Sequence, residues 1–272
     1  MRIEWSHIKK VYRTEDDKKW SSRLIFPRET RTGLLDFSAS TKRGITVVLG
    51  PKGSGKSTLL KVTATISVPN DGRVTYTMDN KKVWVWSRNR AEMSGTSGLE
   101  GLKNRIGYVP QRKRLEEDIS VEEAMVYLAQ NRRVPQPKRR AAELMARWGL
   151  AGYRKHELSQ LPKSALSRYW LAQSLLTDPD IWLLDEPAEG LDELGWELLC
   201  QELLHHPSHR LTLIATNDLE LAECADHLML MEGGSCRRLG ARHLLTASVP
   251  DGSVASWYRT MQTFSGLHSR IK

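Results

Sequence analysis

Few cysteines and no long apolar run occur in this sequence, and these absences limit the classes of protein to which it can belong. The 272 residues include 3 cysteines, Cys200, Cys224 and Cys236, and no Cys-x-x-Cys pair. An odd number without paired spacing argues against a disulfide framework or a zinc site and favours a reducing cytosol. Because no run of about 18 apolar residues is present, we expect no membrane-spanning helix. Residues 1–7 also lack the apolar core and cleavage site of a secretory signal.

The sequence also lacks an internal repeat and an acidic bias. No repeat is apparent at a period of about 20–50 residues, which argues against a solenoid. The 41 Lys+Arg and 32 Asp+Glu give a net charge of +9. Basic clusters such as Lys81-Lys82, Arg112-Lys113-Arg114 and Lys138-Arg139-Arg140 are compatible with nucleic acid or an anionic membrane, but a solvated surface is the commoner explanation. Hydrophobic residues at 40% and charged residues at 27% are typical of a globular protein.

Short β-rich runs alternate with helical patterns along the chain, which predicts an α/β fold. Residues 45–49, 181–184 and 211–215 are nearly continuous apolar runs, typical of parallel strands that are covered on both faces. Residues 1–40 and 73–86 alternate more, which favours an antiparallel lobe beside the parallel sheet.

The middle of the chain, residues 112–176, has a helical texture. Ser120 and Glu123 match the capping box that starts a helix. A second helical stretch begins near Lys138 and stops at Gly149, a residue type that commonly ends helices. We therefore expect a helical subdomain inserted into the α/β core.

The remaining segments complete the predicted organisation. The core comprises residues 1–111 and 177–245, and Gly233-Gly234 indicates a hairpin near its end. Residues 246–272 form a tail with a weak pattern, apart from a helix that Pro250 interrupts. The polar, glycine-containing residues 87–102 are the best candidate for a mobile insertion.

The strongest local signal begins at Gly50, where the pattern Gly-x-x-x-x-Gly-Lys-Ser lies between a predicted strand and a predicted helix. Glycines let backbone N–H groups converge on phosphate oxygens, and the helix N-terminus adds its positive dipole. Lys56 can place its charge between the β- and γ-phosphates, and Ser57 offers a hydroxyl to Mg²⁺. A glycine-rich turn without nucleotide is the alternative, which the full motif in context disfavours. The predicted nucleotide-binding residues are Gly50, Pro51, Lys52, Gly53, Ser54, Gly55, Lys56, Ser57 and Thr58.

An acidic pair, Asp185-Glu186, follows the apolar run at 181–184. The carboxyl edge of a parallel sheet is where ligands bind in open α/β folds. Asp185 can hold Mg²⁺ through water there, and Glu186 can orient or deprotonate an attacking water. The alternative is that the pair only caps a helix.

These motifs, in this order, resemble the nucleotide-binding subunit of ATP-binding cassette (ABC) transporters over about residues 1–245. Gly107-Tyr108-Val109-Pro110-Gln111 is similar to the family's Q-loop, and Gly190-Leu191-Asp192 is similar to its D-loop. Asp226 and the hairpin after it resemble the closing segment. The resemblance implies a P-loop NTPase core, a mostly parallel sheet flanked by helices, with an antiparallel β lobe and an inserted helical subdomain.

The resemblance also implies roles for two residues outside the phosphate loop and the acidic pair. Gln111 would contact Mg²⁺ and the attacking water and would relay contacts with a membrane subunit; an exposed loop residue is the alternative. Tyr12 matches the aromatic residue that stacks on adenine. Trp5 or Trp20 competes for this role, and the long polar stretch at 14–32 could displace Tyr12.

Two family motifs are degenerate. Where the family has the signature Leu-Ser-Gly-Gly-Gln, this chain has Leu161-Pro162-Lys163-Ser164-Ala165. Pro162 has neither a hydroxyl nor an N–H to offer a γ-phosphate, although proline is sterically acceptable in the first turn of a helix. Lys163 could offer a charge instead, but a solvated lysine is the commoner case.

The second departure lies at the switch histidine, where Thr216-Asn217-Asp218 replaces the family's Thr-His-Asp. Asn217 can hydrogen-bond a phosphate or a water, but it carries no positive charge near neutral pH. We count Asn217 with Glu186 and Gln111 as catalytic candidates, and Ser57, Gln111 and Asp185 as metal ligands. The alternative is that Asn217, with Glu220 after it, starts a helix as its N-cap.

The sequence thus predicts a cytoplasmic, peripheral ATP-binding subunit of an ABC membrane transporter, with ATP and Mg²⁺ as cofactors and slow or partner-dependent ATP hydrolysis. The expected partners are a multi-span membrane subunit and a second ATP-binding subunit, either a second copy or an intact relative. The alternative is a nucleotide-gated regulatory module with little ATPase activity. A nucleic-acid partner is not expected, since relatives that act on RNA carry two cassettes or long coiled coils.

Overall fold

The computed structural model describes residues 1–13, 30–79, 82–88, 92–93, 98–111 and 118–269. Most of the polar stretch at 14–32 and the basic triplet at 112–114 lie outside the described residues. Within the described chain, no helix is long and apolar enough to cross a bilayer.

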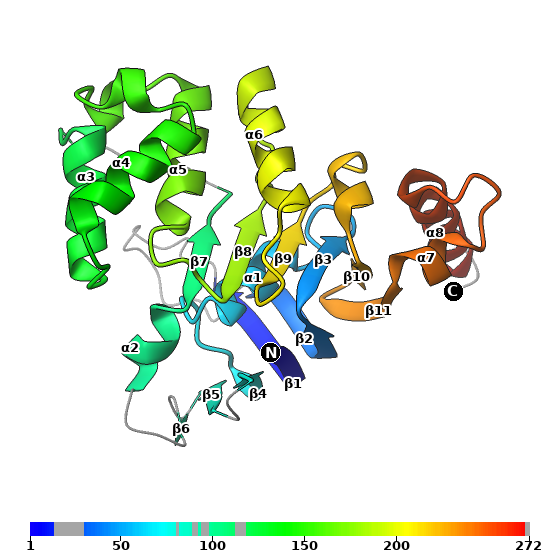
Figure 1. Ribbon diagram of the computed structural model, residues 1–272. Helices are drawn as coiled ribbons and strands as arrows, with labels where there is room; N and C mark the ends of the chain where they lie inside the picture. Colours follow the sequence, from blue (N-terminus) through cyan, green and yellow to red (C-terminus); the bar gives the residue numbers. More distant parts are fainter. Residues whose placement is uncertain (14–29, 80–81, 89–91, 94–97, 112–117, 270–272) are drawn as a thin grey trace, which may run out of the picture.

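A six-stranded, mostly parallel sheet forms the centre of the molecule (Figure 1). All its neighbouring strands are parallel except β10 and β11, which form the predicted hairpin around Gly233-Gly234. Every residue of β8 and β9 is buried, as expected for strands covered on both faces. The strand order is β11 (Ser235–Ala241), β10 (His227–Glu232), β3 (Gly44–Leu49), β9 (Leu211–Ala215), β8 (Ile181–Asp185) and β7 (Ile106–Val109).

The predicted antiparallel lobe is a second sheet of five strands, which packs against α1 (Lys56–Thr63). Thr63 joins the two: its hydroxyl accepts a hydrogen bond from Trp5 Nε1 at 2.9 Å, and its carbonyl accepts one from Tyr76 at 2.6 Å. Both aromatic side chains are buried, so the lobe fixes the helix that follows the phosphate loop. The order is β2 (Thr30–Lys42), β1 (Arg2–Arg13), β4 (Asp71–Thr77), β5 (Val83–Ser87) and β6 (Glu92–Met93).

The described part of the inserted region is helical, as predicted, and lies at one end of the sheet (Figure 1). Ser120 and Glu123 form both hydrogen bonds of the capping box at the start of α3. Gly149, with φ of 62°, follows the end of α4. The helices are α3 (Val121–Asn131), α4 (Pro137–Arg147), α5 (Lys163–Ser174) and the short turns η1 (Ala151–Tyr153) and η2 (Leu158–Gln160).

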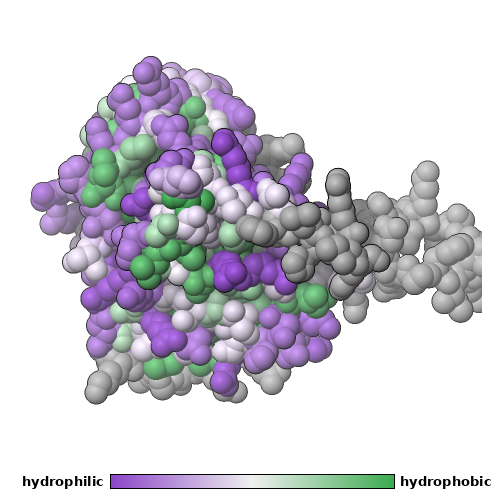
Figure 2. All heavy atoms as spheres, turned by 90° about the vertical axis from the view of Figure 1, so that its right-hand side faces the viewer, coloured by the Kyte–Doolittle hydropathy of each residue, from purple (hydrophilic) through white to green (hydrophobic). Residues whose placement is uncertain are grey.

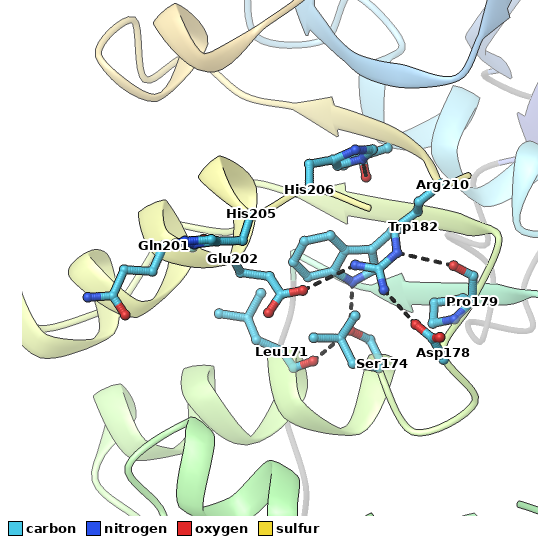
Figure 3. A network of polar contacts seen from close by, with 12 residues as sticks. Leu171, Ser174, Asp178, Pro179, Trp182, Gln201, Glu202, His205, His206 and Arg210 are labelled. Carbon is cyan, nitrogen blue, oxygen red and sulfur yellow. Dashed lines mark hydrogen bonds and ion pairs between the residues drawn. The ribbon is translucent and has the colours of Figure 1, made fainter. Parts of the chain in front are cut away.

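A buried polar network fastens the helical region to the sheet (Figure 3). Arg210 donates to Glu202 Oε1 at 3.1 Å and to Asp178 Oδ1 at 2.8 Å, and its guanidinium lies 5.7 Å from the ring centre of Trp182. Glu202 also forms an ion pair with Arg147 on α4. Because Arg147 ends α4 while Glu202 belongs to α6 (Glu193–Leu204) and Arg210 precedes β9, the network joins α4 of the helical region to the core.

The C-terminal segment differs from the prediction of a weakly patterned tail. It contains α7 (Arg242–Thr246) and the 16-residue α8 (Val254–Ser269), with the predicted break around Pro250. Val254 and Trp257 are buried in the main hydrophobic core. Of the predicted mobile insertion at 87–102, the described parts are the end of β5, the strand β6 and most of α2 (Gly98–Lys103).

Candidate functional site

The loop from Gly50 to Thr58 connects the end of β3 to the start of α1 (Figure 1). Gly55 has φ of 102°, and a Cβ there would lie 2.2 Å from the carbonyl oxygen of Gly33. A Cβ on Gly50 would lie 2.2 Å from the carbonyl oxygen of Met231. The neighbouring backbones therefore enclose the loop on two sides and require glycine at both positions.

Lys56, the first residue of α1, is buried, and its side chain turns back along the loop. Its Nζ donates to Gly50 O at 2.6 Å and to Asn217 Oδ1 at 3.1 Å. Burial lowers the pKa of Lys56 below its ordinary value, and the carboxylates of Glu186 and Asp185 oppose this shift. A buried ammonium bonded mainly to neutral oxygens favours an anionic ligand such as phosphate.

Asp185 ends β8 beside the start of α1, and Ser57 donates its hydroxyl hydrogen to Asp185 Oδ1 at 3.0 Å. Burial raises the pKa of Asp185 from 3.8 to about 6; the hydrogen bond from Ser57 opposes this rise and Glu186 adds to it. Among the described residues, buried Asp185 Oδ2 and Ser54 Oγ have no hydrogen-bond partner. A carboxylate and a hydroxyl at this spacing are oxygen ligands that suit Mg²⁺, and the unpaired oxygens fit a metal and phosphate here.

Glu186 has both carboxylate oxygens bound by the segment that follows β9. Thr216 Oγ1 donates to Glu186 Oε2 at 2.9 Å, and the backbone N–H of Asn217 donates to the same atom at 3.2 Å. The side-chain amide of Asn217 donates to Glu186 Oε1 at 3.2 Å. Glu186 itself has φ of 48°, a backbone conformation that is uncommon for residues other than glycine.

The interpretation of Asn217 as a helix N-cap is wrong. The N-cap of η3 (Leu221–Cys224) is Glu220, and it is Asp218 whose Oδ1 accepts from the N–H groups of Glu220 and Leu221, at 3.0 and 3.1 Å. The turn that follows is the short η3 and not a longer helix. The side chain of Asn217 is thereby left to bridge Lys56 and Glu186.

The other two predicted site residues lie at the borders of this group. Gln111 is exposed beyond the end of β7, and its amide donates to Glu189 Oε2 at 3.5 Å. Tyr12 lies beside the start of α1: a Cβ on Gly33 would meet Tyr12 Cε2 and the side chain of Thr58, each at 2.9 Å. Tyr12 therefore flanks the phosphate loop.

Known proteins with similar sequences share the region of the chain that holds the phosphate loop and the acidic pair. The family model described as ABC transporter matches residues 35–189, which is more than half of the chain. The chain belongs to the ABC transporter family. The sulfate/thiosulfate import ATP-binding protein CysA of Thermosynechococcus vestitus is 33% identical over 212 residues, which cover 76% of this chain and 57% of CysA. The lipoprotein-releasing system ATP-binding protein LolD 2 of Chlorobium chlorochromatii is 31% identical over 192 residues, covering 69% and 78% of the two chains.

Solved structures of ABC cassettes share the fold. The structure of an ATP-binding subunit of an ABC transporter superposes with a TM-score of 0.74 at 17% identity, covering 96% of this chain and 100% of that one. The cassette MJ0796, a dimer bound to ADP and Pi, has a TM-score of 0.69 at 20% identity, covering 88% and 98%. This chain spans 57%, 36% and 61% of three curated ABC relatives, so it corresponds to a part of each.

The degenerate ABC signature packs against the D-loop of the same chain. Pro162 is the N-cap of α5, one position before the first turn of the helix. A Cβ on Gly190 would lie 2.9 Å from Lys163 Cε, so the stem of Lys163 covers the D-loop. A hydrogen bond from Gly195 N–H is the main cause that lowers the pKa of Asp192, and Ser164 and Arg168 add to it.

Sequence reasoning missed Thr216 and Arg168. Thr216 is fully buried and holds Glu186, although its place directly after an apolar strand was a signal that could have identified it. Arg168 donates to the carbonyl of Gly149 at 2.9 Å and pairs with Asp192 at 3.7 Å. These partners are distant in sequence, so only the fold reveals them.

Proposed function

We propose that this chain is the ATP-binding subunit of an ABC membrane transporter and that it binds Mg-ATP at the phosphate loop. The observation that carries the proposal is the convergence of Lys56, Ser57, Asp185 and Glu186 at one edge of the parallel sheet, with buried oxygens there that lack partners. Relatives named as ATP-binding proteins of import and export systems support it.

Each residue then has a distinct task. Lys56 leaves the carbonyl of Gly50 to pair with the β- and γ-phosphates, and the loop N–H groups bind their oxygens. Ser57 and Asp185 would hold Mg²⁺, and Gln111 would be a further ligand. Bound Mg²⁺ supplies positive charge that offsets charge on the phosphates. Glu186 orients the attacking water, and Tyr12 stacks on adenine beside Thr58.

Calorimetric titration with Mg-ATP tests the proposal. We expect saturable binding, and we expect Lys56→Ala to abolish it because the loop loses the buried ammonium that faces Asp185 and Glu186. Lys138→Ala is the matched control, since Lys138 is exposed on α4, and it should bind like the unmodified chain. A folded chain that takes up no Mg-ATP, or a Lys56→Ala variant that binds normally, would reject the proposal.

The membrane subunit is proposed to dock in a groove that leads to the Q-loop. A cavity of about 490 Å³ lies between the end of α1, β7 and the helical region. Its lining includes Thr65, Tyr108 and Trp170, each with a buried polar side-chain atom that has no partner within the described chain. Because β7 leads directly to Gln111, a segment seated there would act on the site.

Retention of this chain in membranes from cells that co-express a candidate multi-span partner tests the docking. Ile66 lines the groove and is 62% exposed. When Ile66 is replaced by lysine, we expect the chain to be lost from the membrane partner on gentle extraction. Leu204 is 80% exposed on α6 and does not line the groove, so Leu204→Lys is the control. Equal retention of both variants would place the partner elsewhere.

A second candidate function, a nucleotide-gated module with little hydrolysis, is favoured by the hydrogen bonds on Glu186. Thr216 and Asn217 engage both of its oxygens, which leaves it less able to accept a proton from water. Measuring Mg-ATP affinity and turnover separately, with the chain alone and with a second cassette, distinguishes the two functions. Brisk turnover by the chain alone would exclude the module.

A further inference from the structure

The C-terminal helices α7 and α8 lie on the β11 side of the sheet (Figure 1), and hydrogen bonds join them to η3, the turn that follows β9. Val254 is fully buried, and Trp257 and Tyr258 are 2% and 8% exposed in the main core, to which Leu221 and Ala222 of η3 also belong. Seen from this end of the molecule, hydrophobic residues form separate patches among hydrophilic ones (Figure 2). Val254, Trp257 and Tyr258 of α8 are therefore turned into the protein.

Glu223 on η3 joins both C-terminal helices. Its Oε1 accepts from the backbone N–H of Val254, the first residue of α8, at 2.7 Å. Its Oε2 accepts from Arg242 Nη1 at 3.2 Å, and Arg242 Nε donates to the carbonyl of Ala225 at 3.0 Å. A carboxylate at a helix N-terminus is stabilised by an otherwise unpaired N–H and by the helix dipole. One side chain thus fixes η3 from two directions.

The same turn is connected to the candidate site by consecutive hydrogen bonds. Asp218 Oδ1 accepts from the N–H of Leu221 at 3.1 Å, and the N–H of Asp218 donates to Thr216 Oγ1 at 3.0 Å. Thr216 Oγ1 in turn donates to Glu186 Oε2 at 2.9 Å. Between Asp218 and Thr216 lies Asn217, which contacts Lys56 and Glu186. Displacement of η3 would therefore move the groups that hold Glu186.

We propose that Glu223 is a positioning residue through which α7 and α8 hold Asn217 and Glu186 at the γ-phosphate end of the site. This inference rests on the proposed function, because it assigns the C-terminal helices a role in the recognition of ATP. The backbone N–H groups of the phosphate loop would bind the α- and β-phosphates, which ADP also carries, and they are not bonded to η3. Loss of Glu223 should thus weaken binding of ATP and spare binding of ADP.

Paired titrations of the full chain with Mg-ATP and Mg-ADP test this role. In Glu223→Ala, we expect the ratio of ATP to ADP affinity to fall by about fivefold or more, a coupling of ordinary size for sites that communicate through a fold. Glu223→Gln keeps an oxygen that accepts from Val254, so its ratio should stay within about twofold of the unmodified chain. Glu197→Ala, at an exposed position on α6, is the matched control.

The outcomes separate this inference from the proposed function. If Glu223→Ala leaves the ratio unchanged, or if ATP and ADP affinity fall equally, the positioning role is overturned while ATP binding stands. If the unmodified chain binds no Mg-ATP, both are overturned. If Glu223→Ala does not fold, Arg242→Gln removes the bonds from Arg242 to Glu223 Oε2 and to the Ala225 carbonyl but keeps the bond from Val254 to Oε1, and the same comparison of ATP with ADP decides.

Discussion

Asn217 donates a side-chain hydrogen bond to Glu186 Oε1 across 3.2 Å, where the related transporters have a histidine before the same aspartate. The amide is neutral and its donors are already used in part on Glu186. It therefore holds the carboxylate in place without supplying charge to a phosphoryl group. Any hydrolysis at this site would have to proceed without the histidine that the family's motif provides.

Asn217→His should raise the rate of Mg-ATP hydrolysis. In other enzymes, removing one preorganised hydrogen-bond donor raises the activation free energy by about 3–4 kcal/mol. Because this site still lacks the usual signature, we expect a histidine at position 217 to recover only about tenfold in rate. Steady-state phosphate release, with Mg-ATP affinity measured in parallel, checks this. The double variant Asn217→His/Glu186→Gln is the control and should lose the gain. An unchanged rate at unchanged affinity would show that position 217 does not limit turnover.

The free energy of unfolding should depend on pH, because the pKa of Asp185 is raised to about 6 from an ordinary 3.8. The folded chain binds this proton more tightly than the unfolded chain, so ionisation costs stability, and the free energy of unfolding falls as pH rises from about 4 through 6. Asp185→Asn should remove this loss and stabilise the metal-free chain by roughly 1–3 kcal/mol at pH 7.5. Urea denaturation at pH 5.0 and 7.5 measures both effects.

The same variant also tests the role of Asp185 in metal binding. Asp185→Asn should lose the dependence of ATP affinity on Mg²⁺, because a neutral amide is a poor ligand for a hard cation. If Asp185→Asn is no more stable than the unmodified chain at pH 7.5, the buried carboxylate is not the origin of the slope.

Local patterns in the sequence predicted local structure well. The capping box at Ser120, the glycine hairpin and the strand before Gly50 each depend on residues close together in the chain, and each is present. The helix α8 had a signal that was overlooked: buried or partly buried residues at 254, 257, 258 and 261 have helical spacing. The prediction of a weakly patterned tail did not use that spacing.

Contacts between distant residues could not be predicted in this way. Asn217 and Asp218 both have side chains that can accept from the N–H groups of a following turn, and only the path of the chain after β9 decides that Asp218 does so. The bond from Val254 to Glu223 joins residues 31 positions apart, and that from Ser57 to Asp185 joins residues 128 apart. The family resemblance suggested the second pair, whereas nothing in the sequence suggested the first.

Tyr12 should contribute to nucleotide affinity through its ring rather than its hydroxyl. Stacking on an aromatic ring is worth about 0.5–1.5 kcal/mol beyond area burial, so Tyr12→Ala should weaken Mg-ATP binding by roughly 2–12-fold. Tyr12→Phe keeps the ring beside Gly33 and Thr58 and should bind like the unmodified chain. Fluorescence titration with an adenine nucleotide analogue measures both. Equal affinity of all three chains would assign the adenine contact to another residue.

The network around Arg210 should be a major source of stability, because Glu202 and Arg210 are only 4% and 3% exposed. Removing one partner of a buried ion pair leaves an uncompensated charge and costs about 3–5 kcal/mol. Glu202→Ala should lower the free energy of unfolding by that amount. Arg147→Met breaks the other ion pair of Glu202, but Arg147 is 53% exposed, so solvent replaces most of the interaction and the cost should stay below about 1 kcal/mol. Chemical denaturation of both variants and of the exposed control Glu197→Ala measures these losses in the free energy of unfolding. An equal loss in Glu202→Ala and Arg147→Met would mean that burial does not set the strength of the Glu202–Arg210 pair.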